Sequence, residues 1–179
     1  MNDQFTEQDK STWQKLTSVV GKKVTSIYVN SYLFQTERRL DDTPLQLNFS
    51  DSTIIYLDGE SDGESLRVTM AAWHDPFSGK VDLENTLYIQ QFGNWVQDNM
   101  SDTPPFDQVV GKVIEETLPI INQFGKLNGV QFVIDDVILN FEVNFDECRI
   151  AHRCFQKVLL FMTISAYLLT YDYVNNFLS

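Results

Sequence analysis

The segment from Leu57 to Leu66 carries the residues whose spacing comes nearest to a binding chemistry. It reads LDGESDGESL and places four acids at alternate positions: Asp58, Glu60, Asp62 and Glu64. Calcium-binding loops begin in this way, but they end in a bidentate Glu at the twelfth position and lie between helices. The twelfth residue here is Thr69, and the preceding STIIYL reads as a strand. We therefore interpret the segment as an acidic turn between strands and predict no metal site.

Histidine is the side chain best suited to acid–base chemistry near neutral pH, and the chain has only His74 and His152. His74 stands beside Asp75 in the segment AAWHDPF, where Trp73 could line a pocket. However, adjacent residues seldom point the same way, and no G-x-S-x-G segment offers a serine nucleophile. We therefore predict that the protein is not an enzyme, and a hydrolase that uses His74 ranks third among the alternatives.

The remaining reactive groups give no pattern typical of a cofactor site. Cys148 and Cys154 are too few for a secreted disulfide scaffold, which favours two packing thiols in a reducing cytosol. With His152 they form Cys-x3-His-x-Cys, which is poor zinc spacing without a second cluster. The segments VVGKK and VVGKV lack the spacing of a phosphate-binding loop. We therefore predict no cofactor.

Charge is the least ordinary property of the chain. Its 25 acids and 13 bases give a net charge of −12 and a pI near 4.4. Such a field repels nucleic acids and anionic membranes and favours basic partners. Lys and Arg are absent from three long segments, 40–66, 81–111 and 127–148. These segments predict a strongly negative face, although acids that only solvate the surface would give the same pattern.

Size and charge together resemble those of bacterial immunity proteins, which capture basic toxins or nucleases. We therefore expect a non-enzymatic, cytoplasmic binding module whose acidic face engages a basic protein and no nucleic acid. The expected partner-binding residues are four acids and three aromatic anchors: Asp58, Glu60, Asp62, Glu64, Tyr56, Trp73 and Trp95. The alternative is a carrier or sensor that binds an apolar small ligand in an aromatic-rich β cavity.

The elements that position these residues are mostly strands, which predicts an α+β fold dominated by antiparallel sheet. The segment 45–50 alternates apolar and polar residues and precedes TIIYLD, so the two form a predicted hairpin. A second hairpin is predicted in GVQFVIDDVILNFEVNF. One face of its later strand would hold Val137, Leu139, Phe141, Val143 and Phe145. A further strand is expected in ESLRVTMAAWHD, and Gly93-Asn94 predicts a tight turn between two strands in TLYIQQFGNWVQ.

The pattern starts again after SDTPPFD, in which Pro104-Pro105 can continue neither a helix nor a sheet. VVGKK at 19–23 is echoed by VVGKV at 109–113, and a β-rich stretch and a hairpin follow each. This favours two similar β-meander units, 19–68 and 109–150, produced by internal duplication. Two unrelated meanders with a common β pattern would look the same in the sequence.

The two ends of the chain differ in character. Residues 1–12 lack the basic and apolar regions of a secretory signal and predict a flexible acidic tail, followed by a short helix in TWQKLTSVV. Residues 158–171 carry no charge, but as a helix they would span only about 21 Å, short of a bilayer core of about 30 Å. We therefore predict one globular domain over 13–179 and no membrane span. Residues 148–171 would form an apolar C-terminal helix, buried against the sheet or in a homodimer.

Overall fold

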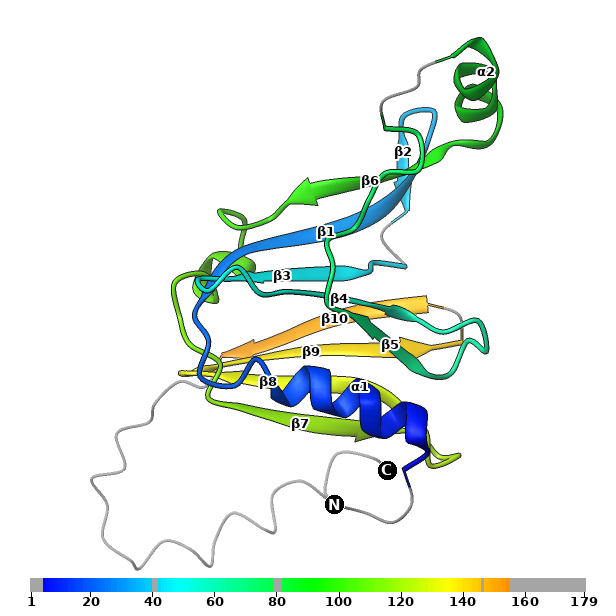
Figure 1. Cartoon of the computed structure of the whole chain (residues 1–179). Helices are drawn as coiled ribbons and strands as arrows, with labels where there is room; N and C mark the ends of the chain where they lie inside the picture. Colours follow the sequence, from blue (N-terminus) through cyan, green and yellow to red (C-terminus); the bar gives the residue numbers. More distant parts are fainter. Residues whose placement is uncertain (1–4, 40–41, 79–81, 146, 155–179) are drawn as a thin grey trace, which may run out of the picture.

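The computed structural model describes residues 5–39, 42–78, 82–145 and 147–154, and this part of the chain forms two antiparallel sheets with two α-helices (Figure 1). The first sheet has the order β2-β1-β3-β4-β5, with β6 paired to β1. Its strands are β1 (Val24–Phe34), β2 (Glu37–Arg39), β3 (Leu45–Phe49), β4 (Ile54–Gly59), β5 (Leu66–Thr69) and β6 (Asn94–Asn99). The second sheet, in the order β10-β9-β8-β7, contains β7 (Glu116–Ile121), β8 (Leu127–Ile134), β9 (Val137–Asn144) and β10 (Glu147–Cys154). The predicted α+β class with mainly antiparallel sheet is confirmed.

Both hairpins predicted from alternating residues are present. β3 pairs with β4, with Leu47 opposite Ile55, and β8 pairs with β9, with Phe132 opposite Leu139. All four of these side chains are fully buried. Because alternate residues of a strand point to opposite faces, the apolar sets of the two hairpins lie on one face of each sheet.

The apolar faces of the two sheets contribute to one core. Its largest fully buried side chains include Phe132, Phe141, Leu45, Leu47, Ile55, Leu57, Leu127, Ile134 and Leu139. A direct link between the sheets comes from Thr43, whose N–H donates to the Cys148 carbonyl at 3.0 Å. Phe145 departs from the pattern, since it follows the last residue of β9, has a φ of 51° and is 80 % exposed. The prediction that Phe145 lies on the buried face is therefore wrong, because the strand ends before reaching it.

Helix α1 (Glu7–Thr17) covers one side of the core, beside β5 and β7 (Figure 1). It begins with a capping box, in which the Asp9 N–H donates to Thr6 Oγ1 at 3.1 Å and the Thr6 N–H donates to Asp9 Oδ2 at 3.0 Å. Leu16 near its other end is fully buried in the core. The helix begins before the predicted TWQKLTSVV, so residues 7–12 are helical where the sequence predicted a tail.

Two segments differ from the predicted secondary structure. Residues 83–92 form helix α2 (Leu83–Phe92) and not one arm of a hairpin, because Asp82 caps its start and Gly93, with a φ of 82°, ends it. Cys148 to Cys154 belong to strand β10, so the predicted start of the C-terminal helix is wrong. The rest of that prediction, including 158–171, lies outside the described residues. Within the described residues, no helix is long and apolar enough to cross a bilayer.

The two VVGK segments meet at one end of the sheets and exchange backbone hydrogen bonds in a reciprocal pattern. The Gly21 N–H donates to the Ile114 carbonyl (2.8 Å), and the Gly111 N–H donates in the same way to the Val24 carbonyl (2.9 Å). The Val24 N–H donates to the Lys112 carbonyl (2.8 Å), and the Ile114 N–H donates to the Lys22 carbonyl (3.0 Å). Each bond of one segment thus has a counterpart in the other, ninety positions along the chain. We call this arrangement the glycine crossing.

The side chains of the glycine crossing repeat the same correspondence. Lys22 Nζ lies 2.7 Å from Asp51 Oδ2, in the turn between β3 and β4. Lys112 Nζ lies 2.9 Å from Asp136 Oδ1, in the turn between β8 and β9. Each lysine is therefore paired with an acid in the hairpin turn of its own half of the chain.

Candidate binding cleft

A surface cleft of about 300 Å³ lies at the end of the sheets away from the glycine crossing. Three connections meet there: the loop from β4 to β5, the loop from β7 to β8, and the chain after β9. Its lining residues are Gly63, Glu64, Asn122, Gln123, Phe124, Asn128, Glu142, Val143, Asn144 and Phe145. Loops held together by a rigid sheet are a common setting for binding residues.

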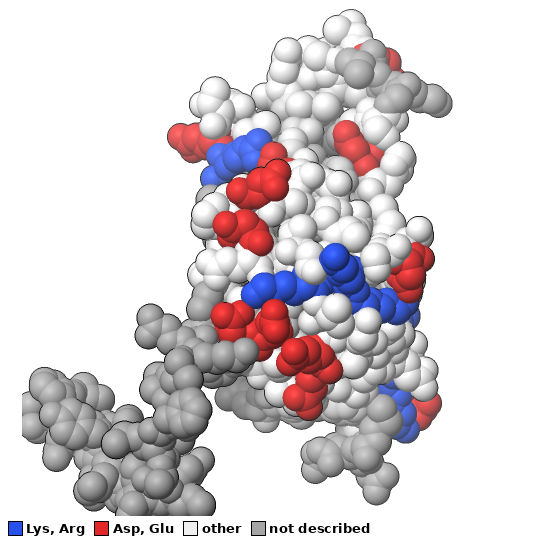
Figure 2. Space-filling view, turned by 90° about the vertical axis from the view of Figure 1, so that its left-hand side faces the viewer, with Lys and Arg blue, Asp and Glu red and all other residues white. Residues whose placement is uncertain are grey.

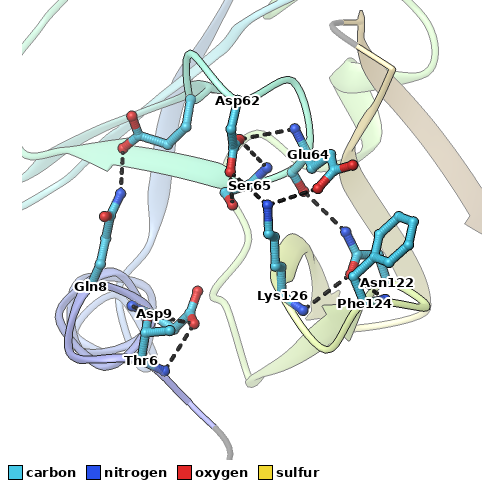
Figure 3. Close-up of polar contacts among 10 residues, drawn as sticks. Thr6, Gln8, Asp9, Asp62, Glu64, Ser65, Asn122, Phe124 and Lys126 are labelled. Atoms are coloured by element: carbon cyan, nitrogen blue, oxygen red, sulfur yellow. Dashed lines mark hydrogen bonds and ion pairs between the residues drawn. The ribbon is translucent and has the colours of Figure 1, made fainter.

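The β4–β5 loop is an ordered turn fixed by Asp62, as Figure 3 shows. Asp62 Oδ1 accepts hydrogen bonds from the backbone N–H groups of Glu64 at 3.0 Å and Ser65 at 2.9 Å. These bonds, with the Ser65 hydroxyl and the Lys126 ammonium, hold the pKa of Asp62 well below its usual range, the Glu64 N–H contributing most. The interpretation of this segment as a turn between strands is confirmed, since β4 pairs with β5 on either side of it.

Lys126 joins this loop to the second sheet. Its ammonium lies 2.7 Å from Glu64 Oε2 and 3.0 Å from Asp62 Oδ2 (Figure 3). The side-chain amide of Asn122 adds a bond to the Glu64 carbonyl at 3.4 Å. Two carboxylates therefore share one ammonium, which leaves a net negative charge beside the cleft.

The other two predicted acids, one in β4 and one in the loop after it, have different partners. Asp58 forms an ion pair with Arg67 on the neighbouring strand. Glu60 Oε1 accepts a hydrogen bond from the side chain of Gln8, in α1, at 3.0 Å. Only Glu64 of the four predicted acids lines the cleft. The four acids are thus directed to three different neighbours and do not form one common site.

Two polar residues of the second sheet form the opposite wall of the cleft. Asn128 is 5 % exposed, and its amide nitrogen donates to the Val143 carbonyl at 3.1 Å and to Glu142 Oε1 at 3.3 Å. Among the described residues, Asn128 Oδ1 has no hydrogen-bond donor. The charged groups that line the cleft are therefore two carboxylates, from Glu64 and Glu142, and they stand beside the side-chain amides of Asn122, Gln123, Asn128 and Asn144.

Two exposed phenylalanines flank these acceptors. Phe124 is 63 % exposed and Phe145 is 80 % exposed. The position of Phe124 is fixed by Asn122, whose Oδ1 accepts the Phe124 N–H at 3.0 Å and the Lys126 N–H at 3.1 Å. Aromatic rings beside carboxylates suit a cation, because a ring face attracts a positive charge and a carboxylate accepts its hydrogen bonds.

Sequence reasoning missed most of this cleft. Glu142 lies on the polar face of a correctly predicted strand, and that position was the only feature of the sequence that pointed to it. Phe124 lies in the loop between β7 and β8, and Asn128 lies near the start of β8. The positions of both depend on the pairing of β7 with β8, which the sequence did not reveal.

The three predicted aromatic anchors do not line the cleft. Tyr56 is buried, its hydroxyl accepts a bond from Asn30 at 3.3 Å, and its burial raises the pKa of the phenol above the usual range. Trp73 is half-buried, with its backbone N–H bonded to Gln46 Oε1 at 2.9 Å. Trp95, also half-buried, packs edge-on against Tyr32 with ring centroids 5.6 Å apart. Tyr56 and Trp95 belong to strands of the first sheet and Trp73 to the segment after β5, so the three do not share the cleft with Glu64.

The remaining reactive residues are not assembled for chemistry. His74 is exposed, and its Nε2 lies 3.4 Å from the Ser78 hydroxyl, which is a long contact. Cys148 is buried and free, and its burial raises the pKa of the thiol. The described residues contain no group of three His, Cys, Asp or Glu side chains that could hold a metal ion.

Charge at the glycine crossing end of the molecule is mixed. Figure 2 shows this side with basic side chains in a band across its middle and acidic side chains above and below. The lysines of the crossing account for two ion pairs there, Lys22 with Asp51 and Lys112 with Asp136. This side of the molecule is therefore not the strongly negative face that the base-free segments predict.

Comparison of the chain with protein-family models, curated proteins and solved structures found no match.

Proposed function

We propose that the protein is a non-enzymatic binding module that captures a basic protein, with a lysine or arginine side chain of the partner entering the cleft between Glu64 and Glu142. The observation that carries the proposal is the composition of the cleft, whose charged lining side chains, Glu64 and Glu142, are both carboxylates and share the lining with two exposed aromatic rings. An immunity-type inhibitor of a basic toxin or nuclease in a bacterial cytoplasm is the form of this function that best suits the net charge of −12.

Glu142 is the main acceptor in this proposal. Its hydrogen bond from Asn128 is long, at 3.3 Å, and comes from an uncharged donor, so a charged donor can compete for the carboxylate. Glu64 already shares Lys126 with Asp62 and therefore supplies a weaker, long-range attraction. A partner cation that enters from solvent would lie between the two.

Phe145 supports a role in binding by the conformation that it adopts. A non-glycine residue at a φ of 51° is strained. Because the Phe145 side chain is also exposed, its packing contributes little to the stability of the fold. Such a residue is expected where a side chain must be presented to a partner.

We also propose that units 19–68 and 109–150 arose by internal duplication. Both halves contain a meander in chain order, β1-β3-β4-β5 and β7-β8-β9-β10, apart from the short β2. The reciprocal bonds of the glycine crossing and the two equivalent lysine–aspartate pairs support this origin. Homodimer formation through 158–171 stays a prediction on residues outside the described part.

The proposed function is tested by affinity capture from extracts of the cells that produce the protein. The bait is the wild type, the double variant Glu64→Gln/Glu142→Gln, or a control with the same loss of charge, Glu115→Gln/Glu116→Gln, at exposed positions outside the cleft. We expect the wild type and the control to retain a basic protein at low salt and the cleft variant to lose it. Equal retention by all three baits, or no basic protein on the wild type, would contradict the proposal.

A further inference from the structure

The second sheet has a face that points away from the core and carries apolar side chains. In β8 and β9 the core residues alternate with half-buried ones, which therefore point outward. Leu118 of β7 lies directly opposite Gln131 of β8, so it points to the same side, and it is 38 % exposed. We call the following six residues the outer face: Leu118, Ile120, Gln131, Val133, Ile138 and Asn140.

One polar atom of the outer face lacks a partner. Asn140 Oδ1 is inaccessible to solvent, and it receives no hydrogen bond from the residues that the structure describes. Buried acceptors in proteins are almost always paired with a donor. We therefore expect a group outside the described ranges to lie against this part of the sheet.

The first sheet has a matching arrangement of outward side chains. One row of directly opposite residues crosses β1, β3, β4 and β5 in the order Tyr28, Gln46, Tyr56 and Thr69. The corresponding row crosses β7, β8, β9 and β10 in the order Leu118, Gln131, Asn140 and Ala151. In the next row Asp58 lies opposite Arg67, and Glu142 lies opposite Arg149. The two sheets therefore present equivalent positions on their outward sides.

A chain segment covers this row in the first sheet. Residues 70–78 leave β5 and pass back over the sheet toward α2 (Figure 1), and the Trp73 N–H donates to Gln46 Oε1 at 2.9 Å. Gln46 and Tyr56 are consequently only 3 % and 9 % exposed, whereas Gln131 and Asn140 at the matching positions are half-buried. The chain that follows the last strand of the meander thus covers the outward side of its own sheet.

The counterpart of this segment is the chain that follows β10. It contains the uncharged residues 158–171, and Val158 can lie up to about 14 Å from Cys154, enough to reach a layer about 10 Å from the sheet. As a helix these residues would span about 21 Å, which fits on strands of eight residues that are about 27 Å long. The segment also contains Thr163 and Ser165, whose hydroxyl groups can donate a hydrogen bond.

We propose that segment 158–171 docks on the outer face within the same chain, as residues 70–78 cover the first sheet, and that one of its hydroxyl groups donates to Asn140 Oδ1. Leucine, isoleucine and valine side chains of the outer face match the apolar composition of the segment. The inference depends on the matching registers of the two sheets. It is independent of the capture of a basic protein, and its test changes no residue that lines the cleft.

Paramagnetic broadening in nuclear magnetic resonance spectra locates the segment in the full chain. A nitroxide is attached to Ser165→Cys in a chain that also carries Cys154→Ser, and Cys148 is buried and does not compete for the label. We expect the backbone amide signals of Gln131, Asn140 and Ala151 to be lost and to return when the nitroxide is reduced. The amide signals of β6, at the far side of the first sheet, should keep their intensity.

A charge on the outer face should release the segment. Ile138→Lys should restore the lost signals, because a lysine there opposes an uncharged apolar segment. Leu87→Lys is the matched control, since it adds the same charge at an exposed leucine of α2, and it should leave the signals broadened. Dispersed amide signals show that a variant is folded, and Val133→Lys, directly opposite in β8, replaces Ile138→Lys if that variant does not fold.

Three results would overturn the inference. Full intensity of the outer-face signals beside the nitroxide would place the segment elsewhere. Signal loss in a mixture of isotope-enriched unlabelled chains with nitroxide-labelled chains of natural abundance would show that a second copy supplies the segment. Persistent broadening in a folded outer-face lysine variant would show that the apolar contact does not hold the segment there.

Discussion

Replacing Phe145 with glycine should leave the free energy of unfolding almost unchanged, although a large aromatic side chain is removed. The wild-type residue has a φ of 51°, a conformation that costs a non-glycine residue about 1–2 kcal/mol and that glycine adopts freely. Glycine also raises the conformational entropy of the unfolded chain, which lowers the free energy of unfolding by about 0.4–1 kcal/mol. Together these two terms leave a net gain in stability of roughly 0 to 1.6 kcal/mol.

The lost contact area is also small. Phe145 is 80 % exposed, so about a fifth of a side-chain surface of roughly 200 Å² is buried, or about 40 Å². At about 25 cal/mol per Å² this is worth about 1 kcal/mol. We therefore expect a change within about 1 kcal/mol of zero. Phe141→Ala, at a fully buried position four residues earlier, should cost about 3–5 kcal/mol.

Urea unfolding followed by far-ultraviolet circular dichroism measures both changes. A loss above about 2 kcal/mol for Phe145→Gly would show that the side chain is packed in solution, as expected if the apolar alternation of β9 continued to this residue. Such a loss would refute the account of a strained, exposed residue. In the same variant, partner binding should weaken. Unchanged binding would show that the strain is not retained for recognition.

Three further outcomes follow from the structure. Because the folded-state pKa of Asp62 is lowered, its contribution to stability is fully present above the unfolded value of about 3.9 and is lost progressively as pH falls from there through the folded-state pKa. Asp62→Asn should therefore lower stability by at most about 1 kcal/mol near pH 6, and the difference from the wild type should shrink steadily in unfolding measured at pH values below about 4. Gly21→Ala and Gly111→Ala, at φ of 82° and 86° with no atom near the added methyl, should each cost about 1–2 kcal/mol; calorimetric values that differ by more than about 1 kcal/mol would argue against equivalent halves. Millimolar calcium should leave the Tm unchanged, and a rise of several degrees would instead reveal a site in the acidic turn.

The hairpins could be predicted from the sequence because their information is local. The alternation of apolar and polar residues in 45–50 and 137–143 indicates which side chains face the core. The two strands of each hairpin are separated by only a few residues, so their pairing is also local information. The same reasoning failed at Phe145, because alternation does not say where a strand ends. It also failed at Gly93, since a glycine that permits a hairpin turn equally permits a helix end.

The cleft could not be predicted, because its groups come from distant parts of the chain. Lys126, which neutralises part of the acidic loop, lies 64 positions from Asp62. Glu64 and Glu142 line the same cleft only because the two sheets share a core. Local composition identified the acidic loop but gave no indication that Asp58 and Glu60 would be bonded to other residues.

The association rate constant with the captured partner, measured by stopped flow at increasing salt, tests the central claim most directly. Screening lengths fall from about 10 Å at 0.1 M salt to about 3 Å at 1 M, so electrostatic capture predicts a rate at least about tenfold lower at the higher salt. Glu64→Gln/Glu142→Gln should lower both the rate at low salt and the affinity, while Glu115→Gln/Glu116→Gln should leave the affinity unchanged. A rate indifferent to salt, with equal affinities for both variants and the wild type, would show that neither charge nor the cleft governs recognition.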